Sequence, residues 1–553
     1  MSVAVLSHLA FPWRDARRVG RAAVLCVAAA MLAACSNPSP PRAMHAFVDN
    51  VTLFPLAHYD QNVDHWLDPQ SPDYDRPFLS AADQQAHFHA LYARYFGTGA
   101  NAPSPWNADY VTARVYRQQG EDIAALQQRR IDKFDNTGKH GAALGYGENF
   151  RPHDKAWIDA IARNMNVAQF TQAPLYQPER RAIATGNLMV RELPTDDPSF
   201  YDHHLAGEGY PFDNLQISAV RPGTPLYVLG SSVDGAWRYV QTPDVQGWVR
   251  SDGVAFADDR FVDRWRAAAG QSLGAVTVAS AAVRDSRGVF RFEAPAGTLL
   301  PLLPESSVVS SATAAATTHG VSSAANGSIT GDTASRVANE ATTTHQLLVP
   351  ARDVDGRALI RTASLDDTQI ASMPLTATPR HLAMLMKALI GRPYGWGNSG
   401  LYNDCSSELQ SIFAAFGVWL PRHSSTQMSA GRMVDLSAST PAERLAYLAQ
   451  HGEALRTLIY IGGHVMLYIG NTTRDGVTVP VVYQDVWGLR PADNSRRAVI
   501  GGSVILPLYE HIPEDATLQS LAATPTFQIS ILGAPAGSAP PSAPPPDEDN
   551  PAG

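Results

Sequence analysis

The chain has 553 residues, which is long enough for several domains. Its formal net charge is -9 and its sequence pI is about 6.0, so neither gives a reason to expect a nucleic-acid partner. Hydrophobic residues make up 45% of the chain, which is ordinary for a soluble protein. Composition therefore predicts a multi-domain protein and leaves its activity to be read from local motifs.

Residues 1–35 have the shape of a secretory signal peptide. Arginines between Arg14 and Arg21 precede an apolar run, 22–34, that is too short for a comfortable membrane span. The run leads into Cys35 through Leu-Ala-Ala, which resembles a bacterial lipobox. That resemblance implies a lipid on Cys35, so we expect a periplasmic protein anchored to the (outer) membrane. Ordinary signal cleavage beside a chance cysteine is the alternative.

The cysteine count gives Cys405 a special place. The only other cysteines are Cys26, which would be lost with the signal peptide, and Cys35, which would carry the lipid. Cys405 would then be the one thiol of the mature chain and could form no internal disulfide. A thiol kept in an oxidising compartment suggests catalysis, whereas the alternative is a small buried hydrophobic residue.

Residues 44–175 are predicted to be mostly helical and irregular. Ser80 caps a helix whose aromatic and leucine residues share one face until Gly97, and another helix surrounds Trp157. The histidines of this segment have no spacing typical of a metal site, and the sequence as a whole predicts no metal and no cofactor.

Two small β-barrels are predicted next, at 176–260 and 270–375. In the first, short β-rich runs alternate with turns, and its Asn-Leu-x-Val-Arg opening and Gly-Trp-Val ending resemble a bacterial SH3 domain. The second repeats the theme around a Ser/Thr/Ala-rich insert, 305–345, whose composition predicts disorder. Beyond them, the Pro-rich stretch 530–553 is predicted to be a disordered tail.

The first barrel carries an insertion, 206–213, that enlarges one loop. Its polar residues Glu208, Tyr210 and Asp213 are the best candidates for substrate contact outside the catalytic residues. The alternative is an ordered loop that packs on a neighbouring domain.

The stretch 392–409 is the centre of the predicted activity. A helix capped by Thr378 ends at Gly391, a glycine-rich loop follows, and a buried helix then starts near Cys405. Free N–H groups and the helix dipole at such a start favour a thiolate over a thiol. Cys405 is therefore a candidate nucleophile.

A nucleophilic cysteine needs a base, and His464 is the candidate. It lies after two glycines in a predicted strand, 460–470, and a second strand, 479–488, follows after a turn. An antiparallel pair would place a residue of the second strand beside His464, where it could orient the imidazole. Gln484 is our first candidate and Asp485 the second, because neighbouring strand residues point to opposite faces.

Together, Tyr-Gly-Trp-Gly, Asp-Cys-Ser at a helix start and Gly-His-Val on a strand resemble the NlpC/p60 family of cell-wall cysteine peptidases. The similarity covers about 376–510 and implies a papain-like α+β domain, so the whole chain is expected to be multi-domain α+β. Ser407 stands where the family commonly has Gly, and Gln484 where many members have His. By the same resemblance, substrate would be bound by a subsite and its wall, formed by Asp404, Ser406, Ser424, Tyr394 and Trp396.

The resemblance also implies a reaction. We expect a Cys-His-Gln endopeptidase that cleaves the γ-D-glutamyl–meso-diaminopimelate bond of peptidoglycan stem peptides, in cell-wall remodelling or recycling. In relatives with this domain order, the SH3-like domain narrows the cleft and can enforce a free L-Ala terminus. The helical segment 44–175 would be the stabilising region of such proteins. The alternatives are another cysteine amidase or acyltransferase on the same scaffold, or a non-catalytic cell-wall binding lipoprotein.

Overall fold

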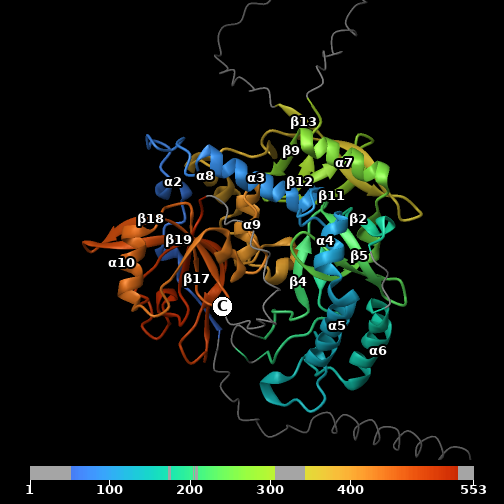
Figure 1. Ribbon diagram of the computed structural model, residues 1–553. Helices are drawn as coiled ribbons and strands as arrows, with labels where there is room; N and C mark the ends of the chain where they lie inside the picture. Colours follow the sequence, from blue (N-terminus) through green and yellow to red (C-terminus); the bar gives the residue numbers. More distant parts are fainter. Residues whose placement is uncertain (1–50, 172–175, 204, 206–208, 305–342, 534–553) are drawn as a thin grey trace, which may run out of the picture. The chain divides into compact units, whose positions relative to one another are not determined.

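The computed structural model describes residues 51–171, 176–203, 205, 209–304 and 343–533 (Figure 1). The expected signal peptide and lipid anchor, nearly all of the expected insert, Glu208, and the tail beyond residue 533 lie outside these ranges. Helices combine with antiparallel sheets along the described chain, so the predicted multi-domain α+β fold is confirmed. No helix within the described ranges is both long and apolar enough to cross a membrane.

The segment 51–171 is mainly helical. Its helices are α2 (Val63–Trp66), α3 (Ala81–Phe96), α4 (Ala108–Tyr110), α5 (Glu121–Phe134) and α6 (Lys155–Met165). The longest, α3, begins where the Ser80 side chain accepts a hydrogen bond from the Asp83 N–H, and it ends at Gly97 as the sequence predicts.

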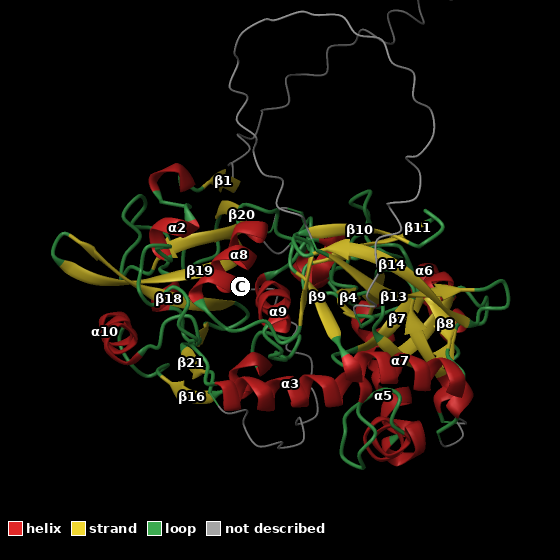
Figure 2. Ribbon diagram, turned by 90° about the horizontal axis from the view of Figure 1, so that it is seen from above, coloured by secondary structure: helices red, strands yellow, loops and turns green. Residues whose placement is uncertain are grey.

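Helix α3 joins parts of the chain that are far apart in sequence. The Gln84 side-chain amide donates to the carbonyl oxygens of Leu375 and Phe416, at 2.6 and 2.9 Å. Farther along the helix, the Tyr92 hydroxyl donates to the carbonyl of Arg266, at 3.3 Å. Arg266 belongs to α7 (Asp259–Gln271), and Figure 2 shows α3 running from the C-terminal sheet to this helix.

The first barrel is one sheet with the strand order β4-β3-β7-β6-β5-β2-β8. Its strands are β2 (Arg181–Ala184), β3 (Leu188–Arg191), β4 (Gln216–Val220), β5 (Pro225–Ser231), β6 (Trp237–Gln241), β7 (Gln246–Arg250) and β8 (Val254–Phe256). The β-rich runs singled out in the sequence correspond to β3, β5, β6 and β7.

The second barrel follows α7 and is built from three separate small sheets. Its strands are β9 (Leu273–Val276), β10 (Ser280–Arg284), β11 (Phe290–Pro295), β12 (Leu299–Pro301), β13 (Thr344–Arg352), β14 (Ala358–Asp366) and β15 (Ile370–Ser372). Strand β9 lies between β12 and β15, whereas β10 pairs with β11 and β13 pairs with β14.

The two ends of the insert are held together, which gives a first prediction. Leu302 forms an antiparallel bridge with Leu347, and the Leu303 N–H donates to the carbonyl of Gln346 at 2.8 Å. A short Gly/Ser turn in place of 306–342 should therefore keep both activity and melting temperature nearly unchanged, because loop-closure entropy depends weakly on loop length. Thermal melts of the two proteins check this. A large loss of melting temperature would show that the insert contributes to the folded barrel.

The C-terminal domain is a sheet with the order β1-β20-β19-β18-β17-β21-β16. The strands are β1 (Val51–Leu53), β16 (Arg432–Asp435), β17 (Thr457–Tyr460), β18 (Val465–Arg474), β19 (Val477–Leu489), β20 (Arg497–Pro507) and β21 (Gln528–Ile531). The boundary expected at residue 510 is wrong, because β21 pairs with both β17 and β16. Four residues of polar–apolar alternation are too short a signal to identify such a strand from sequence.

Three helices accompany this sheet: α8 (Pro379–Leu389), α9 (Cys405–Ala415) and α10 (Pro441–His451). Helix α8 starts after the Thr378 cap as predicted. Helix α9 is central, and Figure 2 shows it between the strands β18 and β19 on one side and β9 of the second barrel on the other. The helix that begins with Cys405 is thus enclosed by more than its own domain.

Candidate active site

Cys405 is the first residue of α9, as the sequence predicts. The Asp404 carboxylate accepts a hydrogen bond from the Ser407 N–H at 3.0 Å, and the Ser407 hydroxyl accepts one from the Asp404 N–H at 2.9 Å. This reciprocal capping box fixes the start of the helix, and serine at 407 is one half of it. The thiol is 6% exposed and therefore lies in a recess rather than on an open surface.

The turn that carries His464 lies close to this thiol. The Cys405 Sγ is 4.0 Å from the carbonyl oxygen of Gly463, the residue directly before His464. Both Gly462 and Gly463 have positive φ, +81° and +95°, which glycine adopts without strain. The prediction that His464 sits within a strand is wrong: it closes the turn between β17 and β18, because these two glycines end the first strand.

The structure brings Gln484 beside His464. The His464 Nε2 donates to the Gln484 Oε1 at 2.7 Å, from the turn before β18 to the neighbouring strand β19. This bond fixes the ring and leaves Nδ1 as the nitrogen that can exchange a proton. Gln484 is fully buried, and its Nε2 has no hydrogen-bond partner among the described residues.

Asp485 belongs to a different cluster. Its strand neighbour Tyr483 donates a hydrogen bond to the buried Glu408 of α9, as does Ser503 of β20 at 2.8 Å. Burial, together with the nearby carboxylates of Glu408 and Asp404, raises the pKa of Asp485 well above its usual range. The Asp485 Oδ1 has no hydrogen-bond partner among the described residues, whereas Gln484 accepts the bond from His464, so the geometry favours Gln484.

The protonation states of the pair differ from the expectation. Burial raises the pKa of Cys405 to about 12, with a further rise from the Asp404 charge and an opposing effect of the Val465 N–H. Burial also lowers the pKa of His464 to about 4. The prediction of a favoured thiolate is therefore wrong, because desolvation outweighs the helix start. At neutral pH the free site holds a thiol and a neutral imidazole, which can act as a general base.

The buried His464 predicts a pH-dependent stability. Its pKa is about 4 when folded and 6.5 in the reference state, so between these values the unfolded chain binds more protons. Stability should fall as pH drops through this window, by about 3 kcal/mol from this residue. Denaturant unfolding of wild type and His464→Gln at pH 7 and pH 4.5 checks this, and the variant should lose less. Equal losses in both proteins would contradict the assignment of a buried neutral ring.

Aromatic side chains gather beside the site. Tyr394 and Trp396, predicted as a wall, are half-buried, and their rings lie 6.4 and 5.5 Å from the ring of Phe212. The Trp487 ring of β19 lies 5.3 Å from the same Phe212 ring. Phe212 comes from the insertion of the first barrel. That loop therefore packs on the C-terminal domain, which was the alternative to substrate contact that the sequence left open. The exposed Tyr210 lies 5.2 Å from Phe200, ring to ring, within its own barrel region.

The polar residues predicted for the subsite differ in their burial and in their hydrogen-bond partners. Asp404 and Ser406 are buried and bonded to Arg422, whose Nη2 donates to Asp404 at 2.6 Å and Nη1 to Ser406 at 2.8 Å. Burial alone would raise the pKa of Asp404, but Arg422 holds it below its usual value. Ser424 is half-buried in the loop after α9. Direct substrate contact by these residues stays a prediction.

Sequence reasoning missed three residues of this region: Phe212, Arg422 and Trp487. Arg422 lies in the Leu-Pro-Arg-His-Ser loop that follows α9. An arginine that follows a helix capped by an aspartate could have been predicted to pair with that aspartate, because a buried carboxylate needs a partner. Within the described ranges, no group of three or more His, Cys, Asp or Glu side chains is placed to hold a metal ion.

Comparison with known families matches four parts of the chain. Residues 24–170 match the N-terminal NLPC_P60 stabilising domain, 198–250 an SH3 domain of SH3b1 type, 258–307 an SH3 domain of SH3b2 type, and 391–494 the NlpC/P60 family. The predicted family and both SH3-like domains are thus confirmed.

Two individual proteins are similar to this chain. A solved NlpC/P60 endopeptidase from Photobacterium damselae subsp. piscicida has a TM-score of 0.69 and 24% identity, over 86% of this chain and 98% of that one. A γ-D-glutamyl-L-lysine dipeptidyl-peptidase of Bacillus subtilis (strain 168) is 35% identical over 86 residues, which is 15% of this chain. The match spans 29% of that relative's length. The first likeness supports the fold, and the second is confined to one segment.

Proposed function

Since the chain is a multi-domain NlpC/P60 protein with two SH3b domains and a stabilising domain, we propose that it is a Cys405-dependent endopeptidase of peptidoglycan stem peptides. The bond we assign is the γ-D-glutamyl–meso-diaminopimelate bond. The observation that best supports this proposal is the arrangement of the site. Cys405 starts α9, its sulfur lies 4.0 Å from the Gly463 carbonyl oxygen, and Gln484 holds the His464 ring by a hydrogen bond.

The first half of the reaction uses this geometry directly. His464 takes the Cys405 proton through Nδ1 as the sulfur attacks the carbonyl carbon of the scissile amide. Gln484 accepts the Nε2 hydrogen bond and keeps the ring oriented while it carries the positive charge. The free N–H groups at the start of α9 are aimed to stabilise the oxyanion, with the Cys405 N–H among them. His464 then gives the proton to the leaving amine.

The second half returns the enzyme to its starting state. The thioester on Cys405 is attacked by water while His464 takes one water proton, the tetrahedral intermediate then expels the sulfur, and His464 returns the proton to it. The neutral resting pair suits this cycle, because His464 begins each half as a base rather than as an imidazolium. The Gln484 carbonyl carries no charge, so it orients the ring while it raises the His464 pKa less than a carboxylate would.

The Bacillus subtilis relative supports the bond that we propose, because its name places its activity at a γ-D-glutamyl linkage. Its matched segment is short, so the diamino acid on the other side of the bond rests on the family resemblance alone. We further propose that the protein acts in the periplasm from a lipid anchor at Cys35, in wall remodelling or recycling. The basic, apolar leader that ends in Leu-Ala-Ala-Cys supports this location.

Digestion of defined peptides tests the assignment. L-Ala-γ-D-Glu-meso-diaminopimelate with a free or an acetylated L-Ala amine is incubated with the protein, and products are identified by mass. We expect L-Ala-D-Glu and free diaminopimelate, with the acetylated peptide cleaved more slowly. Transfer of the acyl group to an added amine, with no hydrolysis, would instead support an acyltransferase. Binding with neither product would support a non-catalytic wall-binding protein.

A further inference from the structure

The first SH3b domain lies directly against the loop that precedes Cys405. The Gln216 side-chain amide of β4 donates to the carbonyl of Gly397, at 2.8 Å, and the Trp396 indole donates to the carbonyl of Asp213, at 3.1 Å. Gly397 has φ of +58°, and a Cβ added to it would lie 2.7 Å from the Gln216 Cγ and 2.8 Å from its backbone oxygen. The second glycine of Tyr-Gly-Trp-Gly is thus required by contact with another domain.

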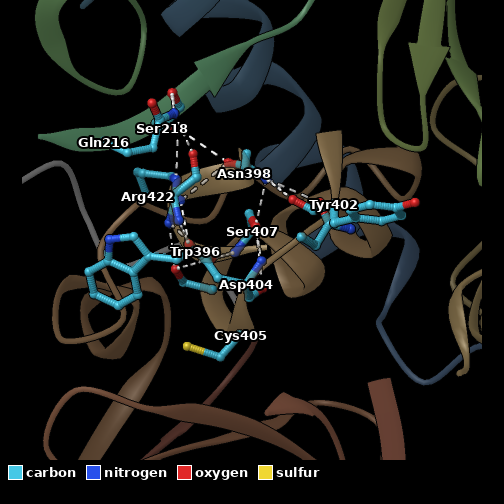
Figure 3. Close-up of polar contacts among 12 residues, drawn as sticks. Gln216, Ser218, Trp396, Asn398, Tyr402, Asp404, Cys405, Ser407 and Arg422 are labelled. Atoms are coloured by element: carbon cyan, nitrogen blue, oxygen red, sulfur yellow. Dashed lines mark hydrogen bonds and ion pairs between the residues drawn. The ribbon is translucent and has the colours of Figure 1, made fainter. Parts of the chain in front are cut away.

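Arg422 carries this contact into the active site (Figure 3). Its Nε donates to the Ser218 hydroxyl of β4 at 2.8 Å, and its Nη2 donates to the Asn398 side-chain Oδ1 at 3.2 Å. Nη1 and Nη2 both donate to the Asp404 carboxylate, at 3.1 and 2.6 Å, and Nη1 also reaches the Ser406 hydroxyl. These bonds match the five N–H groups of a guanidinium, so its position is fixed from both domains.

The Asp404 carboxylate accepts hydrogen bonds from several other groups as well. Besides the two bonds from Arg422, its carboxylate accepts the Ser407 N–H at 3.0 Å, the Ser406 hydroxyl at 3.1 Å and the Gly397 N–H at 3.2 Å. A carboxylate offers about four lone-pair sites, and in the free protein these five bonds occupy them. Asp404 is also the N-cap of α9, and any shift of its carboxylate moves the start of the helix that presents Cys405.

Resting on the proposed peptidase function, we propose that Ser218 of the first SH3b domain is a positioning residue for the start of α9. It holds Arg422, Arg422 holds Asp404, and Asp404 sets the helix start that presents the Cys405 sulfur and the oxyanion-binding N–H groups. Arg422 has a second effect through charge. It balances the Asp404 carboxylate beside Cys405, and without that balance a buried negative charge would oppose the negative charge that develops on sulfur and oxyanion.

Ser218→Ala is the direct test, because it removes one hydroxyl from a buried position without adding volume. Ser530→Ala is the matched control: Ser530 of β21 is also buried, and its hydroxyl has no hydrogen-bond partner among the described residues. We expect Ser218→Ala to lower kcat about fivefold to tenfold with KM changed less than about twofold, because positioning affects the transition state more than binding. Ser218→Thr, which keeps the hydroxyl, should restore most of the rate, and Ser530→Ala should match wild type.

A second readout separates this inference from the peptidase assignment. The rate of Cys405 alkylation by iodoacetamide, followed against pH, needs no substrate and reports the surroundings of the thiol. We expect Ser218→Ala to shift that pH profile upward, and Ser530→Ala to leave it unchanged. If Ser218→Ala and Ser530→Ala agree in both turnover and profile, the positioning role is overturned while the peptidase function stands. If wild type cleaves no murein peptide, the proposed function fails, and the alkylation profiles still decide whether Ser218 acts on Cys405.

Discussion

Replacement of Cys405 with alanine is expected to abolish peptide hydrolysis and to leave the fold intact. No other described side chain beside His464 can form the thioester, so the rate should fall by a factor of about 10³ or more. The cost to stability should be small, about 1 kcal/mol, because one buried sulfur is lost from a recess that is still filled by its neighbours. Peptide turnover and a thermal melt of the same preparation measure both effects.

Cys405→Ser is the matched control for this change. It keeps the shape of the side chain and its place at the start of α9, but a serine hydroxyl is a much weaker nucleophile with a neutral imidazole as its base. We expect it to fold like wild type and to be nearly as inactive as Cys405→Ala. Turnover within tenfold of wild type in either variant would remove Cys405 from the mechanism and leave the site as a binding surface.

The second large effect is expected at Gln484. Gln484→Ala should lower kcat about tenfold to a hundredfold, because the His464 ring loses the acceptor that orients it. Cys405 should remain present and alkylatable in this variant. Gln484→His should keep much of the activity, since histidine can also bond the ring. Steady-state kinetics with thiol titration distinguishes a misoriented base from an unfolded protein.

Asp485→Asn is the control for Gln484. Burial and the neighbouring carboxylates raise the pKa of Asp485 and so favour its uncharged form, and asparagine keeps that shape without a charge, so the change should cost little activity. If Asp485→Asn proves more damaging than Gln484→Ala, Asp485 is the residue that supports His464 during catalysis, and the hydrogen bond to Gln484 belongs only to the resting state.

Local chemistry made much of this site predictable. The Thr378 cap and the apolar periodicity that follows placed α8, and Gly391 placed its end. Alternation along a single strand predicted that only one of Gln484 and Asp485 can face His464, and the structure bonds Gln484 to the ring. These inferences depend on residues that are adjacent in sequence or related by one hairpin.

What sequence could not supply depends on burial and on contacts between distant segments. The helix start at Cys405 argued for a thiolate, but the thiol is enclosed by other parts of the chain, and desolvation raises its pKa instead. Nothing in the sequence indicated that Arg422 bonds the Asp404 carboxylate, or that Ser218 of another domain bonds Arg422 in turn. Strand β21 joins the sheet between β17 and β16 although its four residues give little signal of their own.

The central claim is that Cys405 forms a covalent acyl-enzyme at the γ-D-glutamyl carbonyl. Its most direct test is rapid acid quench of enzyme mixed with L-Ala-γ-D-Glu-meso-diaminopimelate, followed by intact-protein mass and peptide mapping. Gln484→Ala is included, because a misoriented base should slow deacylation and allow the thioester to accumulate. We predict an added L-Ala-γ-D-Glu mass on the peptide that contains Cys405, absent in Cys405→Ala. Product release with no adduct on Cys405 in either protein, or an adduct on another residue, would contradict this account.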